Sequence, residues 1–361
     1  MRWMLGVVVV GLFRLLCGAQ ADQQLKPKDA TSAMVALLHT HNIVMLGEAH
    51  DAKQEYEWLC KLVGNPEFAN YVDDIVMEFG NSLYQKSIDR YVSGDDVPVD
   101  EVQNAWRNMI ASVPPVSPVY GWFYKAVRES NMARHGKHQI RLLMGGPPGD
   151  WNKIENSTDL APYEAEREQW YAQVVKDEVL AKHHRALLIM GAGHFLRGYA
   201  QALQDELLAQ QHRAVPPVDR SQLAPGYIER ELRAAGANPY VIVFGTNVVD
   251  GRGDVDRRFD PWSVPVIVPL SGNWVGELPA QPVVTGGHAP TTPLKLADQA
   301  DAMLYVAPCD SLTTVNVSLA EVDGTAYGKE IARRNMIELG RTVTFQYGEV
   351  PMCVQLPPTP Q

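Results

Sequence analysis

VMLGEAH, the stretch from Val44 to His50, is an apolar run that stops at a Gly-x-x-His tetrapeptide. LIMGAGH, from Leu188 to His194, repeats the same plan. An apolar run of this length, rich in branched residues and closed by glycine, predicts a buried strand, because glycine permits a sharp turn off the strand end. Each stretch therefore predicts a strand that delivers a histidine just beyond its carboxyl end.

Three further apolar runs have the character of buried strands, and segments with helical periodicity separate all five runs. The three runs span residues 74–79, 139–144 and 240–244. This alternation predicts an α/β fold with a mainly parallel sheet flanked by helices. We expect one domain over residues 22–361, with a helical insertion at about 81–134 and an irregular C-terminal part at about 250–361. Short strands in that last part are predicted at 264–270, 303–306 and 342–347.

The N-terminus has the features of a secretory signal peptide. Arg2 is followed by an apolar stretch, and the pattern Ala19-Gln20-Ala21 predicts cleavage after Ala21. We therefore expect a periplasmic or secreted protein. No later run approaches the roughly 18 apolar residues of a membrane-spanning helix, so no membrane span is expected.

Charge and cysteine usage narrow the class of protein. The formal net charge is -10 without basic runs, which argues against nucleic acid as a partner. In an oxidising compartment a disulfide between Cys309 and Cys353 is predicted, because both follow late strand-like runs. Cys60 lies in a helical pattern and is expected to be a small core residue.

Several acidic and imidazole side chains follow the predicted strand ends. They are His50 and Glu48 after the first strand, Glu78 at the second, Asp150 beyond the third and His194 after the fourth. Ligands of parallel sheets bind outside the carboxyl ends of the strands, so we expect one catalytic site at this edge. His50, His194 and Glu78 could ligate zinc, manganese or iron. Alternatively, a histidine could activate water without a metal while a glutamate fixes its tautomer.

Each of these residues also has a structural interpretation: Asp150 and Glu48 could cap turns, and Glu78 could form a salt bridge. Four histidines precede predicted strands and are expected at the opposite edge of the sheet: His39, His41, His183 and His184. Weaker site candidates are His288, which could close over the site, and Arg107 and Arg197, which could bind an anion. Nucleophile-elbow, P-loop, His-Glu-x-x-His and dinucleotide motifs are absent from the sequence, which excludes the usual serine hydrolases, NTPases, zincins and dinucleotide enzymes.

The two tetrapeptides, at 47–50 and 191–194, together with Glu78, resemble the superfamily that joins erythromycin esterases, ChaN-like haem-uptake lipoproteins and Tiki/TraB proteins. Runs such as IVMEF at 75–79 and SIDRY at 87–91 are similar to those of an uncharacterised exported bacterial branch. The resemblance covers about residues 40–310. It implies the fold and the site, whereas the chemistry implied differs among members: metal-free ester hydrolysis, metal-dependent proteolysis or haem binding.

The sequence thus predicts an exported hydrolase that acts on an ester or amide of a small molecule or peptide through a paired His/Glu site. A divalent metal is one expected cofactor. The alternative is a haem- or iron-binding uptake protein without turnover, and a third interpretation is a scaffold that only binds a partner.

Overall fold

The computed structural model describes residues 27–110, 117–135, 137–198, 225–245, 252–280 and 294–352, with Leu25, Gln211 and Leu223. The predicted signal peptide, His288 and Cys353 lie outside these residues.

An eight-stranded sheet forms the centre of the molecule, in the order β1-β7-β8-β6-β2-β5-β3-β4. Its strands are β1 (Lys28–Asp29), β2 (Ile43–Glu48), β3 (Asp74–Asn81), β4 (Arg141–Gly146), β5 (Ala186–Gly191), β6 (Pro239–Phe244), β7 (Val266–Pro269) and β8 (Ala302–Tyr305). All neighbouring pairs from β8 to β4 are parallel, and β7 and β1 extend the sheet in antiparallel fashion. The predicted α/β fold with a mainly parallel sheet is confirmed.

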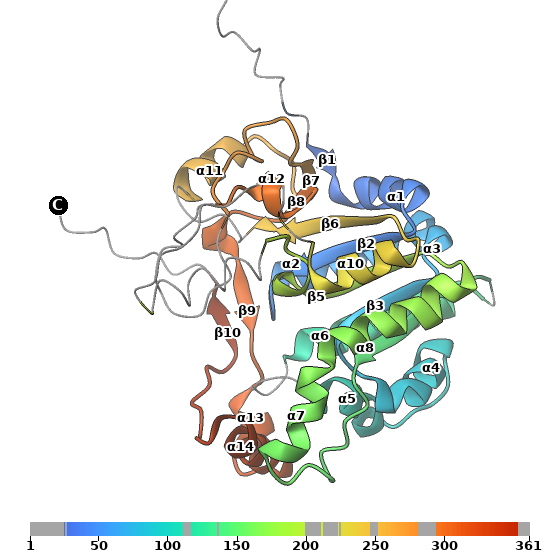
Figure 1. Ribbon diagram of the computed structural model, residues 1–361, viewed down its shortest axis with the longest axis vertical. Coiled ribbons are helices and arrows are strands. Elements are labelled where there is room, and N and C mark those ends of the chain that lie inside the picture. Colours follow the sequence, from blue (N-terminus) through green and yellow to red (C-terminus); the bar gives the residue numbers. More distant parts are fainter. Residues whose placement is uncertain are drawn as a thin grey trace, which may run out of the picture.

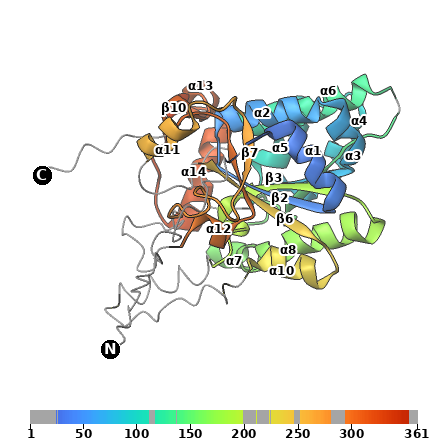
Figure 2. The ribbon, with the colours of Figure 1, turned by 90° about the horizontal axis from the view of Figure 1, so that it is seen from above.

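Helices cover both faces of this sheet, as the view from above shows (Figure 2). One face carries α1 (Ala30–Thr40), α2 (Lys53–Val63), α3 (Pro66–Tyr71), α4 (Gln85–Ser93), α5 (Val99–Arg107) and α6 (Pro118–Ala133). The other face carries α7 (Ser157–Ala165), α8 (Arg167–Val174), α10 (Tyr227–Ala234) and α12 (Leu296–Gln299). Within the described residues, no helix has the length and apolar character needed to cross a membrane.

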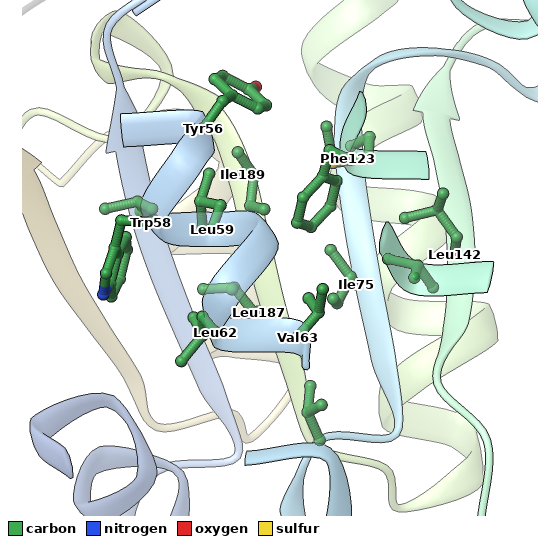
Figure 3. Packing of buried hydrophobic residues seen from close by; sticks show 14 of the residues in the cluster. Tyr56, Trp58, Leu59, Leu62, Val63, Ile75, Phe123, Leu142, Leu187 and Ile189 are labelled. Atoms are coloured by element: carbon green, nitrogen blue, oxygen red, sulfur yellow. The ribbon is translucent and has the colours of Figure 1, made fainter. Parts of the chain in front are cut away.

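Alternation along the central strand β5 supplies both halves of the core. Leu187 and Ile189 pack toward α2, where Leu59 meets them (Figure 3). Leu188, the residue between them, belongs to the cluster on the opposite face, together with Tyr171 of α8. Complete burial of one such side chain contributes about 1.5–3 kcal/mol. The sheet is therefore held from both sides, which fixes the positions of its strand ends.

The C-terminal part adds a second, two-stranded sheet beside the first (Figure 1). It consists of β9 (Thr313–Val315) and β10 (Glu349–Pro351), with α13 (Leu319–Val322) and α14 (Ala326–Leu339) between them in the chain. The amide of Val315 donates to the carbonyl of Asp51 at 2.9 Å, so this sheet supports the loop that carries His50. The short helix α11 (Arg252–Phe259) precedes β7.

One local prediction is wrong. Residues 342–347 form no strand: the alternating apolar residues there find no neighbouring strand to pair with, and the strand begins only at Glu349. Asp51, which follows His50, has a left-handed φ of 65°, and Ala52 takes the N-cap position of α2.

The cysteines agree in part with the prediction. Cys309 is disulfide-bonded, whereas Cys60 is a free thiol. Burial raises the pKa of the Cys60 thiol to about 11, which suits an unreactive packing residue. The pairing of Cys309 with Cys353 stays a prediction.

Candidate functional site

Strand β2 positions the first imidazole–carboxylate pair. Glu48 is the last residue of the strand and is 2 % exposed, whereas the His50 side chain is 51 % exposed. The two meet at 2.5 Å between Nδ1 of His50 and Oε1 of Glu48. Because the carboxylate accepts, Nδ1 donates and Nε2 keeps its lone pair when the ring is neutral. The amide of Ala49 donates to Oε2 of Glu55 at 3.0 Å, which fixes the turn between the two residues.

Strand β5 lies between β2 and β3, so its terminal turn meets residues from both neighbours. Glu78 of β3 is 4 % exposed, and its Oε2 accepts from the amide of Gly191 at 2.5 Å. Its Oε1 lies 3.1 Å from Nε2 of His194, in the 3₁₀ turn that follows β5. The structure therefore brings Glu48, His50, Glu78 and His194 to one edge, as the sequence predicted.

His194 lies between two carboxylates. Its Nε2 faces Glu78, and its Nδ1 lies 2.6 Å from Oε1 of Glu168 in α8. The ring of Tyr171, one helical turn further along α8, packs edge-to-face with the His194 ring, with 5.2 Å between the ring centroids. Glu168 was not predicted, because its segment contains several acidic residues and nothing in the sequence distinguishes this one.

A buried acidic and aromatic layer lies beneath His50. Glu55 is fully buried, and burial with the nearby charge of Glu48 raises its pKa well above the ordinary value. The Phe79 ring packs edge-to-face with the His50 ring. It also stacks on the ring of Tyr120, with 4.0 Å between the ring centroids. Glu55 was not predicted, although it lies four residues before the apolar Leu59 and thus shares the buried face of its helix.

Carboxylates dominate the electrostatics of both histidines. Desolvation by the surrounding protein opposes protonation of His50, but the charges of Glu48 and Glu78 outweigh it and raise the pKa of His50 to about 9. Burial likewise opposes protonation of His194, yet Glu78 and Glu168 raise its pKa to about 10. Burial alone would raise the pKa of Glu78, but the two imidazoles hold it well below its ordinary range. At neutral pH both rings are therefore charged and Glu78 is ionised.

The possible metal ligands that the structure groups differ from the predicted set of His50, His194 and Glu78. In the described part of the chain, the group whose donor atoms all lie within 4.8 Å of one another is Glu48, His50 and Glu78. His194 stands outside this group, and its two nitrogens lie within hydrogen-bond distance of Glu78 and Glu168. One imidazole and two carboxylates still suit zinc, manganese or ferrous iron, so the residues present fit such an ion.

Asp150 lies in a different environment from the one expected. It accepts from the amide of Asn152 at 3.1 Å and pairs with Lys153 at 3.2 Å, in a turn beyond the end of β4. Hydrogen bonding to Asn152 lowers its pKa. Its contacts are thus those of a turn-capping residue, and we assign it no part in the site.

The weaker arginine candidates have structural partners. Arg107 pairs with Glu321 at 3.0 Å, and Arg197 is held by Glu229 and Asp301, each at 2.9 Å. Since these guanidinium groups are paired with carboxylates, they are not free to bind an anion at the site.

Comparison with known proteins finds similarity in solved structures alone. No family model and no curated protein sequence matches the chain. A Bacillus cereus protein is 12 % identical with a TM-score of 0.46 over 78 % of this chain and 94 % of its own. A mutant of the erythromycin esterase EreC in its open conformation is 10 % identical with a TM-score of 0.45, over 76 % of this chain and 92 % of its own. ChaN of Campylobacter jejuni, in a structure with cofacial haem, is 13 % identical with a TM-score of 0.35, over 61 % of this chain and 87 % of its own.

The last two neighbours, EreC and ChaN, come from two of the groups that this sequence resembles in its paired Gly-x-x-His motifs. Their similarity to this chain is distant, so the geometry of the site has to support any assignment of activity.

Proposed function

We propose that this protein is a hydrolase of ester or amide bonds in which His50, oriented by Glu48, activates water. One observation supports the proposal above all others. A half-exposed imidazole is held at 2.5 Å by a carboxylate that is 2 % exposed, at the carboxyl edge of a parallel sheet. A solvent-accessible base with a buried orienting carboxylate is the arrangement that general-base catalysis requires.

The atoms take the following roles. Nδ1 of His50 keeps its proton, which it donates in a hydrogen bond to Glu48. Nε2 removes a proton from water as the water oxygen attacks the substrate carbonyl carbon. The same nitrogen then returns that proton to the departing alcohol oxygen or amine nitrogen. The products are a carboxylic acid and an alcohol or amine, so atoms and protons balance without a further reactant.

Glu78 and His194 act as positioning residues in this proposal. The hydrogen bond from the Gly191 amide to Glu78 ties the end of β5 to β3. His194, charged and held by Glu168, keeps Glu78 ionised beside the His50 ring. In this proposal His194 and Glu78, which were predicted as catalytic residues, therefore position the pair of His50 and Glu48.

A metal-dependent version of the same reaction has a specific observation in its favour, the donor group of Glu48, His50 and Glu78. A divalent ion bound there would supply a Lewis acid and an activated water. Glu48 and Glu78 would then act as ligands instead of orienting groups. The haem-binding alternative has no comparable support among the contacts of the described residues, so we do not propose it. We retain the export of the protein, with cleavage after Ala21, as a proposal that N-terminal sequencing of secreted protein would test.

Metal removal distinguishes the two versions. We expect wild-type protein treated with a chelator and dialysed to retain its turnover of small ester and amide substrates, measured at pH 9. Activity that disappears on chelation and returns with Zn²⁺, Mn²⁺ or Fe²⁺ would replace the metal-free version with the metal-dependent one. Absence of turnover on any ester or amide, with or without these ions, would contradict the hydrolase.

A further inference from the structure

A second concave site lies at the opposite edge of the sheet. Its volume is about 500 Å³, within the range of small-ligand sites. Three segments build it, each leading into one of the neighbouring strands β6, β2 and β5. Four histidines line it: His39, His41, His183 and His184. The sequence analysis placed these residues at this edge, where they take no part in the hydrolytic site.

Two of these rings are fixed through Nδ1. Nδ1 of His184 donates to Oδ2 of Asp74 at 2.7 Å, and Asp74 is 1 % exposed. Nδ1 of His41 lies 2.8 Å from the Thr40 hydroxyl and 3.3 Å from the carbonyl of Leu37, which can only accept. The His184 ring therefore carries a proton on Nδ1 and a lone pair on Nε2 when neutral, and the His41 ring does so when its Nδ1 donates to Leu37.

This arrangement is the usual environment of metal-binding histidines. Such a histidine donates its other ring N–H to a carboxylate or a backbone carbonyl, which sets the tautomer and raises its basicity as a ligand. Asp74 supplies the carboxylate for His184, and Leu37 supplies the carbonyl for His41. The other oxygen of Asp74, Oδ1, is buried without a hydrogen-bond partner.

The remaining two histidines are exposed and can rotate. His39, in the last turn of α1, packs its ring against Tyr71, and His183 holds a left-handed φ of 57° at the entrance to β5. Non-glycine residues in this conformation are uncommon and occur often at ligand sites. The structure shows the cluster in an open arrangement, and exposed side chains change rotamer within nanoseconds. No three of these histidines have ligand atoms within 4.8 Å of one another in the described structure, so binding of an ion requires their side chains to move toward it.

We propose that this pocket binds a divalent transition-metal ion of the kind that prefers imidazole, with Zn²⁺ as its representative. Nε2 of His41 and His184 are the first two ligands, and His39 and His183 complete the coordination. Imidazole nitrogen is a good ligand for zinc, copper and nickel. The buried carboxylate of Asp74 behind His184 favours a bound cation, whereas Arg185, which also lines the pocket, opposes it. The proposal is independent of the proposed hydrolytic function.

Calorimetric titration with Zn²⁺ tests this site. The full chain with His50→Ala is the starting protein, because that change disrupts the other candidate metal group. We expect one equivalent of Zn²⁺ to bind at pH 7.5, and none in the protein that also carries His41→Ala and His184→Ala. Asp74→Asn should weaken binding by about 10–100-fold without abolishing it, as for other carboxylates behind metal-bound histidines.

A second variant carries His39→Ala and His183→Ala. Both side chains are exposed, so this variant should fold, and it should also bind Zn²⁺ more weakly than the starting protein. Circular dichroism checks the fold of each variant. Unchanged Zn²⁺ stoichiometry and affinity in the His41/His184 variant would overturn the proposal. Absence of binding to the starting protein would overturn it equally.

Discussion

Replacement of His50 by alanine should lower kcat/KM for ester hydrolysis by about 10²–10⁴-fold, the usual contribution of a positioned general base. His50 supplies the nitrogen that removes the proton from water, and no other imidazole shares its position. His194 cannot replace it, because both of its nitrogens face carboxylates. Steady-state kinetics at pH 9 provide the measurement. Removal of the imidazole leaves the buried Glu48 carboxylate without its partner, so the thermal unfolding midpoint should fall, and circular dichroism checks that the variant is still folded.

His39→Ala is the matched control for this change. It also removes an exposed imidazole, but at the opposite edge of the sheet, so kcat/KM should stay at the wild-type value. Retention of full activity by the His50 variant would remove His50 from the mechanism. Equal losses in both variants would indicate a general effect on the protein instead of a catalytic one.

Gly191→Ala should reduce activity by about 10²-fold while the protein still folds. A Cβ at this position would lie 2.6 Å from Cε1 and 3.0 Å from Nε2 of His50, distances that force the ring to move. The backbone φ of −51° at Gly191 is one that any residue adopts, so the cost arises from lack of space alone. A displacement of about 1 Å at a reacting group costs roughly 10²-fold in rate. The overpacking costs about 1–3 kcal/mol of stability.

Gly64→Ala provides the control for the glycine change. Gly64 ends α2 with a φ of −77°, and its Cβ would meet no atom nearer than 3.5 Å. Activity and unfolding midpoint should both stay at wild-type values. If Gly191→Ala behaved like Gly64→Ala, the His50 ring would have more freedom than the structure shows, and its fixed orientation could not explain catalysis.

The main features of the site could be predicted because they depend on local pattern. The apolar runs ending in Gly47 and Gly191 predicted two strands that end at one edge of the sheet, and the structure shows that these strands, β2 and β5, pair in parallel register. Once both strands lie in one sheet, the geometry of parallel strands places His50 and His194 at the same edge. Glu78 was predicted for a similar reason, since a carboxylate within an apolar strand needs a partner.

The remaining features depend on contacts between distant segments. Glu168 reaches His194 from a helix on one face of the sheet, and periodicity along that helix carries no information about its partner. The choice between Glu48 and His194 as a possible metal ligand depends on side-chain hydrogen bonds. Asp150 follows the carboxyl end of a strand, which is why it was predicted. Its side chain instead accepts from Asn152 and pairs with Lys153 within its own turn.

The dependence of kcat/KM on pH tests the central claim most directly, because the base must be neutral to act. The pKa of His50 is raised to about 9, so activity of chelator-treated wild-type protein should rise about tenfold per pH unit below that value. It should fall again as His194 loses its proton near pH 10.

Glu48→Gln removes the carboxylate that contributes most to raising the pKa of His50, so the rising limb should move to lower pH and the maximal rate should decrease. A rising limb near pH 9 in the wild type that shifts downward in Glu48→Gln is the predicted result. A rate that is independent of pH between 6 and 9, or a limb that Glu48→Gln leaves in place, would contradict His50 as the base oriented by Glu48.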